Sequence, residues 1–142
     1  MNTGNDSGFA KIRTLTLAGC MKIMAAAEAE ARKNDAMVSI AILDAGGHLL
    51  HFSRMDEAHA GTVDIAIGKA RCAAMFRRPT KAFAERYADG ATAVASLPNV
   101  FPFEGGVPIL IGRECIGAVG ASGAAAAIDG MVALAGVVAL QE

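Results

Sequence analysis

Hydrophobic and polar residues alternate with two different periods along the chain. Between residues 14 and 33 the apolar positions recur at steps of three and four, at Leu17, Cys20, Met21, Met24, Ala27 and Ala31. This spacing places them on one side of a helix, and Asn34-Asp35 is expected to end that helix. The residues that follow, 37–43, are rich in β-branched side chains, which favours a strand.

Two pairs of apolar segments are each interrupted by a short turn, which predicts two β-hairpins. The first covers residues 37–54 and turns at 44–47, where two glycines can adopt positive φ. The second covers residues 108–121. Its return strand contains Gly117 and Gly120, which predict the close approach of a helix or of another backbone.

Three further helices are predicted at residues 61–76, 81–88 and 126–140. Thr62 and Thr80 are expected to cap the first two. The last helix carries almost no charge, so it is expected to be buried or to lie at an interface. The elements then follow the order α-β-β-α-α-β-β-α, with an optional strand in 94–101. Two hairpins imply an antiparallel sheet, and helices packed on it give a layered α/β (α+β) domain.

The composition adds an expectation about assembly. A length of 142 residues is that of one domain, which we place at residues 14–142 after a polar, flexible segment at 1–13. Hydrophobic residues make up 54% of the chain and charged residues only 19%. A small domain this apolar is expected to hide surface against copies of itself, which predicts a homo-oligomer. Much of the apolar content is alanine and glycine, so close backbone packing is the competing explanation.

Charge and cysteine usage argue against several classes of protein. A net charge of −1, with acidic and basic residues mixed, lacks the basic surface that nucleic acids require. No apolar stretch reaches the roughly 18 residues of a membrane span, and the start of the chain has no signal-peptide pattern. The three cysteines lack zinc-site spacing, so we expect reduced thiols, no metal site and a cytoplasmic protein.

Three sequence motifs resemble those of the GlcG/HbpS-like family. Residues 38–56 read VSIAILDAGGHLLHFSRMD, residues 67–80 read IGKARCAAMFRRPT, and residues 101–123 read FPFEGGVPILIGRECIGAVGASG. They are similar to the family's DAGG turn with Arg-Met-Asp, its helix with an Arg-Pro-Thr exit, and its Glu-Gly-Gly-Val-Pro-Ile hairpin. The three motifs occur in the family's order, and the resemblance covers about residues 14–140.

The resemblance implies a profilin-like fold, in which a five-stranded antiparallel sheet has helices on both faces, and it implies homo-oligomers. Relatives include haem-binding or haem-degrading proteins and the C-terminal domain of PduO-type proteins, so haem is the implied cofactor. Relatives tend to continue Gly-Thr-Pro-Glu-x-Asp-Glu after the Ser-Gly at 122–123, whereas residues 124–130 here read AAAAIDG. A polar helix start is thus apolar in this chain, and only Asp129 is retained.

Histidines are the candidate haem ligands. His48 and His51 lie three residues apart on one predicted strand, so they point to opposite faces and cannot chelate one ion together. Haem needs only one axial imidazole, which either could supply. The alternative is that both are exposed or edge-strand histidines without a ligand. His59 is expected to be solvated in a loop.

Cationic residues are candidates for binding a carboxylate or a phosphate. Arg54 could anchor a carboxylate or propionate, or could form an internal bridge to a nearby Asp or Glu. The chain has one local cluster of cations: Lys69, Arg71, Arg77, Arg78 and Lys81. Of these, Lys69, Arg77 and Arg78 could form a cationic rim around a ligand or could cap a helix.

Two turns could also take part in a site. In Glu104-Gly105-Gly106 a carboxylate precedes two residues that let backbone groups approach a ligand. Alternatively, the glycines only make the turn and Glu104 faces water or a neighbouring subunit. The backbone amides of Ser122-Gly123 could bind an anion at the start of a helix.

Three functions are open at this point. The first is a small-molecule-binding oligomer that binds or handles haem or a related tetrapyrrole, although histidines and aromatic residues are scarce. The second is a cofactor-free enzyme of the isomerase or proton-transfer type. It would act on a small carboxylated metabolite, with Arg54 as anchor and Glu104 or Asp129 as acid or base. The third is an accessory oligomer without chemistry.

Overall fold

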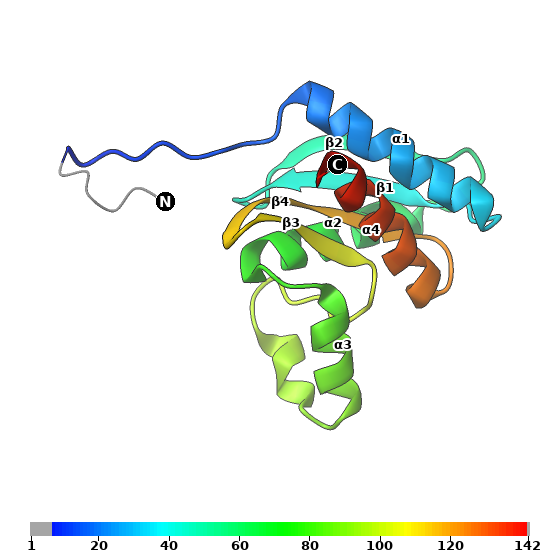
Figure 1. Cartoon of the computed structure of the whole chain (residues 1–142). Helices are drawn as coiled ribbons and strands as arrows, with labels where there is room; N and C mark the ends of the chain where they lie inside the picture. Colours follow the sequence, from blue (N-terminus) through cyan, green and yellow to red (C-terminus); the bar gives the residue numbers. More distant parts are fainter. Residues whose placement is uncertain (1–6, 142) are drawn as a thin grey trace.

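The first helix begins and ends where the sequence pattern predicts. In the computed structural model, which describes residues 7–141, α1 spans Leu17–Lys33. The Thr16 side chain caps it by accepting a hydrogen bond from the Gly19 amide at 3.1 Å. Residues 7–16 belong to no helix or strand, and their N-terminal part extends away from the domain (Figure 1). The rest of the expected flexible segment, residues 1–6, lies outside the described residues.

Four strands form one antiparallel sheet in the described part of the chain. They are β1 (Ser39–Asp44), β2 (Leu49–Arg54), β3 (Gly106–Ile111) and β4 (Glu114–Ser122), in the order β2-β1-β4-β3. The expectation of five strands was therefore wrong. The optional strand expected at 94–101 is absent, because a 3₁₀ helix, Thr92–Ser96, covers the start of this range and residues 97–101 form no helix or strand. Only one residue of the 3₁₀ helix, Val94, is buried, so the segment cannot form a half-buried strand.

Helices cover both faces of this sheet, as expected. The helices α1 and α4 (Ala126–Gln141) lie on one face and α2 (Gly61–Phe76) on the other (Figure 1). Alternation along β1 explains this arrangement, because Ile40 and Ile42 pack toward α1 and α4, whereas Ala41 and Leu43 pack toward α2. The short helix α3 (Thr80–Ala88) projects from one end of the domain.

Glycines of β4 permit the tight packing that the sequence indicates. A Cβ atom on Gly120 would collide with the backbone carbonyl of Ala66 in α2, and one on Gly117 with that of Leu43 in β1. The predicted close approach of a helix and of another backbone is therefore confirmed. It explains how a domain with few large side chains still buries both faces of its sheet.

The two threonines expected to cap helices have other roles. Thr62 lies inside α2, which begins at Gly61, and its buried hydroxyl lies 2.8 Å from that of Ser39. Thr80 is the first residue of α3, and its hydroxyl accepts a hydrogen bond from the Gly106 amide at 2.9 Å. Thr62 Oγ1 also donates to the His59 carbonyl at 2.7 Å, in the loop before α2. Both predictions were wrong, because neither hydroxyl accepts a hydrogen bond from an amide of its own helix. Within residues 7–141, no helix is both long and apolar enough to cross a membrane.

Candidate functional site

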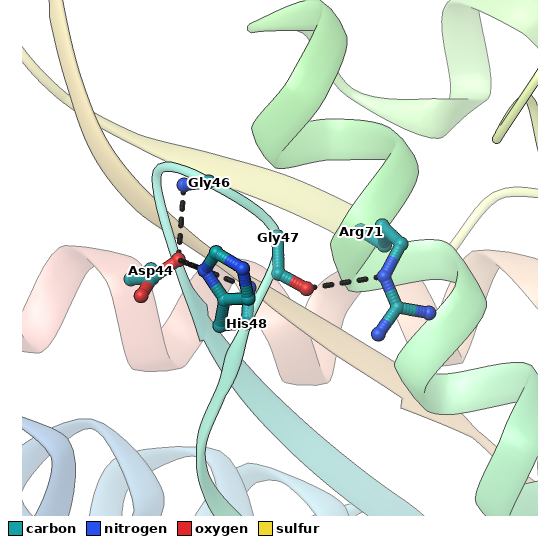
Figure 2. A network of polar contacts seen from close by, with 5 residues as sticks. All are labelled: Asp44, Gly46, Gly47, His48 and Arg71. Carbon is teal, nitrogen blue, oxygen red and sulfur yellow. Dashed lines mark hydrogen bonds and ion pairs between the residues drawn. The ribbon is translucent and has the colours of Figure 1, made fainter.

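The turn between β1 and β2 holds a histidine in a defined orientation. One carboxylate oxygen of Asp44, Oδ1, accepts hydrogen bonds from the amides of Gly46 and His48, at 2.9 and 3.0 Å, and lies 3.3 Å from His48 Nδ1 (Figure 2). An ionised carboxylate only accepts hydrogen bonds, so Nδ1 carries the proton. In the neutral form of this ring the other nitrogen, Nε2, has a free lone pair, and it has no partner among the described residues.

This arrangement is the one that metal-binding histidines use. Their second ring nitrogen donates to a carboxylate or carbonyl, which fixes the tautomer and the orientation of the ring. Partial burial raises the pKa of Asp44. The hydrogen bonds from the His48 and Gly46 amides and the imidazole lower it more, and the pKa is below its usual value. The carboxylate that orients His48 is therefore ionised at neutral pH.

A cation from α2 lies on the other side of the same turn. Arg71 Nε donates to the Gly47 carbonyl at 3.1 Å, and its terminal guanidinium nitrogens have no partner in residues 7–141 (Figure 2). Gly47 has φ of 84°, and a Cβ atom there would contact Arg71 and Met75. The turn thus brings together an imidazole, a guanidinium and the half-exposed thioether of Met75.

The remaining histidines lack the features of an oriented ligand. His51 pairs with Ile42 and so lies on the α1 face of the sheet, whereas His48 is in the turn and not on the strand. The Nδ1 atom of His51 is buried and has no hydrogen-bond partner in the described residues, so nothing holds its ring for ligation. His59 is exposed in a loop, as expected.

A second group of candidates gathers at the opposite end of the sheet, where β4 ends. The loop Glu104-Gly105-Gly106 lines a pocket of about 270 Å³ together with the start of α3 and the first half of α4. Lys69 lies behind this loop, because a Cβ atom on Gly105 would be 2.7 Å from its ammonium nitrogen. Gly105 therefore separates the pocket from the side chain of a buried lysine.

Lys69 and Asp129 form a closed ion pair. The Lys69 ammonium lies 3.1 Å from Asp129 Oδ2 and 3.1 Å from the Ala121 carbonyl, and both side chains are buried. Burial raises the pKa of the Asp129 carboxyl, although the Ala124 amide and Lys69 oppose this. Neither Lys69 nor Asp129 lines the pocket. The arrangement suits a fixed structural pair better than a ligand anchor or an acid–base group.

Asp129 also explains the turn that was expected to bind an anion. The Ala124 amide donates to Asp129 Oδ1 at 2.9 Å, and the Gly123 amide also faces this carboxylate. Gly123 packs on the Met37 carbonyl, and Ser122 is the buried last residue of β4. The strand-to-helix turn thus holds an anion, but the anion is the chain's own Asp129.

The other cations of the predicted cluster are dispersed. Arg77 ends α2 in the left-handed conformation and is exposed. Arg78 donates to the Phe76 carbonyl and lies 5.6 Å from the centre of the Phe83 ring. Only Lys81 lines the pocket. These residues do not form one cationic rim with Lys69.

Arg54 and Glu104 are not brought together in one chain. Arg54 ends β2 and Glu104 precedes β3, and these strands are the two opposite edges of the sheet. Arg54 Nε donates to the Ala58 carbonyl in its own loop at 2.9 Å. An active site with Arg54 as anchor and Glu104 as base is therefore not present within one chain.

The sequence analysis did not assign Asp44 or Arg71 to a site around His48. Asp44 and His48 are separated by three residues across a glycine turn, and an Asp-x-x-x-His spacing there was the available signal. Arg71 was noted only as a member of the cationic cluster. Its contact with the turn depends on how α2 packs against the sheet, which local sequence does not reveal.

Comparison with known proteins identifies the family. A model of the family described as haem degrading protein HbpS-like matches residues 15–138. The chain belongs to the HbpS-like family. It is 47% identical over 100 residues to the protein GlcG of Escherichia coli (strain K12), an alignment that covers 70% of this chain and 75% of GlcG. The predicted resemblance is thereby confirmed.

Solved structures agree with this assignment. A double mutant of HbpS from Streptomyces reticuli superposes with a TM-score of 0.86 at 28% identity, covering 97% of this chain and 94% of that one. PduOC, solved as a haem complex, superposes with a TM-score of 0.81 at 23% identity, covering 89% of this chain and 95% of PduOC. At this lower identity the likeness to PduOC concerns the fold.

Proposed function

We propose that this protein binds haem or a related tetrapyrrole, and that the His48 imidazole would hold the iron. The family described as haem degrading matches nearly the whole domain. The observation that carries the proposal is the contact between His48 Nδ1 and the Asp44 carboxylate, at 3.3 Å, which leaves Nε2 as a ligand. The His48 side chain is 81% exposed, so Nε2 can be approached without a structural change.

The surroundings of His48 fit this cofactor. A haem carries two propionates, and the free end of the Arg71 guanidinium suits a carboxylate, with which arginine can form two parallel hydrogen bonds. Met75 and Leu49, which are both about half exposed, add apolar surface beside the turn. When bound, haem would supply the iron chemistry, while this chain supplies the imidazole, its orientation and a propionate partner.

We also propose that the protein forms homo-oligomers through α4. Met131, Leu134 and Val138 follow one another at steps of three and four and are each 43–50% exposed. This spacing gives one continuous apolar stripe along the helix. Apolar stripes of this kind on a small domain are expected to be covered by a partner, and a second copy is the simplest one.

A haemin titration, followed by the Soret absorption, tests the binding proposal. Wild-type protein is expected to give a saturable shift with fixed stoichiometry. His48→Ala should lose the spectrum of the imidazole complex and weaken binding by about tenfold or more, because the iron loses its ligand.

His59→Ala is the matched control, because it also removes an exposed imidazole but not the one held by Asp44. Its titration should equal that of wild type. The proposal is refuted if haemin does not saturate the wild-type protein, or if the His48→Ala and His59→Ala titrations coincide.

A further inference from the structure

The pocket beside Glu104 is a separate site from the His48 turn. In the sheet, Asp44 pairs with Gly117 at one end, whereas Gly106 pairs with Gly120 and Ser39 with Ser122 toward the other. The pocket's volume of about 270 Å³ is below the range typical of drug-sized ligands. It is therefore suited to a molecule much smaller than a tetrapyrrole.

Glu104 gives this pocket a strong hydrogen-bond acceptor. Its carboxylate lies over the backbone of α4 at Gly130, where an added Cβ atom would be 2.8 Å from Oε2. The side chain is half-buried, and no donor or cation bonds to it among the described residues. An ionised carboxylate only accepts hydrogen bonds, so a ligand that binds against Glu104 is favoured if it brings a donor.

The rest of the pocket defines the other parts of the ligand. The side of α4 contributes Met131 and Leu134, and β3 contributes Val107, so these walls are apolar. Met131 and Leu134 also belong to the stripe of α4 proposed for self-association, so in a homo-oligomer a second copy would cover this side of the pocket. Lys81 lines the pocket from α3, is exposed, and has no partner in residues 7–141. The nearby charges of Lys69 and Asp129 neutralise each other behind Gly105. The pocket therefore offers one carboxylate, one ammonium and apolar surface.

We propose that this pocket binds a short carboxylic acid that carries an amine or a hydroxyl group at its other end. The amine or hydroxyl group donates to Glu104, the carbon chain packs against α4, and the carboxylate pairs with Lys81. The shared chemistry is a hydrogen-bond donor, a short apolar body and an anion. A hydroxy acid and an amino acid both satisfy it, and the experiment distinguishes them.

The test uses the full-length protein and four probes in isothermal titration calorimetry: 4-aminobutyrate, 4-hydroxybutyrate, butyrate and butylamine. At least one of the first two should bind saturably, and the tighter one identifies the donor. Butyrate lacks the donor and should bind about tenfold more weakly, as expected for loss of a hydrogen bond to a charged group. Amide shifts of Gly105, Gly106 and Gly130 in NMR spectra should report the binding.

Variants assign the two charged contacts. Glu104→Gln should weaken the preferred probe by about tenfold, whereas Glu85→Gln, on an exposed position of α3, should leave it unchanged. Lys81→Ala should weaken the carboxylate probes but not butylamine, and Lys33→Ala serves as its control. None of these changes should alter the haemin titration, which keeps the two proposals independent.

Gly130→Ala tests the position of the Glu104 carboxylate without removing it. The new methyl group would displace Oε2, while alanine favours the helix. Binding should therefore fall while the unfolding midpoint stays the same or rises. The proposal is overturned if neither donor-bearing probe binds, if butyrate binds as tightly as they do, or if Glu104→Gln has no effect on affinity.

Discussion

The buried pair of Lys69 and Asp129 gives a large, specific prediction about stability. Lys69→Met keeps the apolar stem of the side chain but removes the charge that lies 3.1 Å from Asp129. It leaves an unpaired carboxylate in the interior, which typically costs about 3–5 kcal/mol. Because Asp129 keeps its hydrogen bond from the Ala124 amide, at 2.9 Å, we expect the lower part of that range, about 3 kcal/mol.

The double variant Lys69→Met/Asp129→Asn separates charge from packing. The asparagine keeps an oxygen for the Ala124 amide but is neutral, so the unpaired buried charge is gone. We expect the double variant to recover at least about 1 kcal/mol relative to Lys69→Met. Urea unfolding, followed by circular dichroism, measures the free energy of unfolding of wild type and both variants.

The stability of the single variant Lys69→Met should also depend on pH. Burial already raises the pKa of Asp129, and loss of Lys69 removes one of the effects that lower it. The folded state of Lys69→Met therefore holds a proton that the unfolded state releases above the usual Asp pKa of about 3.8. Its stability should fall as pH rises from there through the folded-state pKa. The reasoning is refuted if Lys69→Met is as stable as wild type, or if the double variant is no more stable than Lys69→Met.

Three further predictions follow from other parts of the molecule. Asp44→Asn should weaken haemin binding about tenfold. In wild type, the lowered pKa of Asp44 contributes stability that is lost as pH falls below about 3.8 through the folded-state pKa, and Asp44→Asn should remove this contribution. Titrations and acid unfolding check both effects. Leu134→Glu should shift the protein toward monomer in sedimentation velocity, because it puts a charge on the exposed apolar stripe of α4; an unchanged distribution would contradict the interface. Cys115 should react first with a thiol reagent, since Cys20 and Cys72 are buried and burial raises their thiol pKa; peptide mapping identifies the modified residue.

Sequence reasoning succeeded where one element carries its own pattern. The stripe of α1 and the two hairpins have local periods of about 3.6 and 2 residues, so they could be located to within a few residues. The fifth strand expected from the family resemblance is absent from the described residues. The segment at 92–96 has only one buried residue, Val94, which packs against Phe83 of α3. Because this burial depends on the packing of another element, the local sequence does not reveal it.

The candidate sites were harder to predict because they depend on contacts between distant segments. Lys69 and Asp129 are 60 residues apart, and their pairing requires α2 and the start of α4 to meet at the end of β4. From the sequence alone, Lys69 was therefore a candidate cationic anchor and Asp129 a candidate acid or base. By contrast, Asp44 and His48 lie in one turn, so their spacing was a local signal of this contact, although the sequence analysis did not pair them.

The most direct test of the haem proposal compares the two histidines that the sequence left as equal candidates. Haemin is titrated into His48→Ala and His51→Ala, and the Soret absorption of each complex is compared with wild type. His48 is oriented by Asp44, whereas His51 Nδ1 has no partner in the described residues, so only His48→Ala should lose the imidazole-ligated spectrum. Loss of that spectrum in His51→Ala, with His48→Ala unchanged, would contradict the assignment of the ligand.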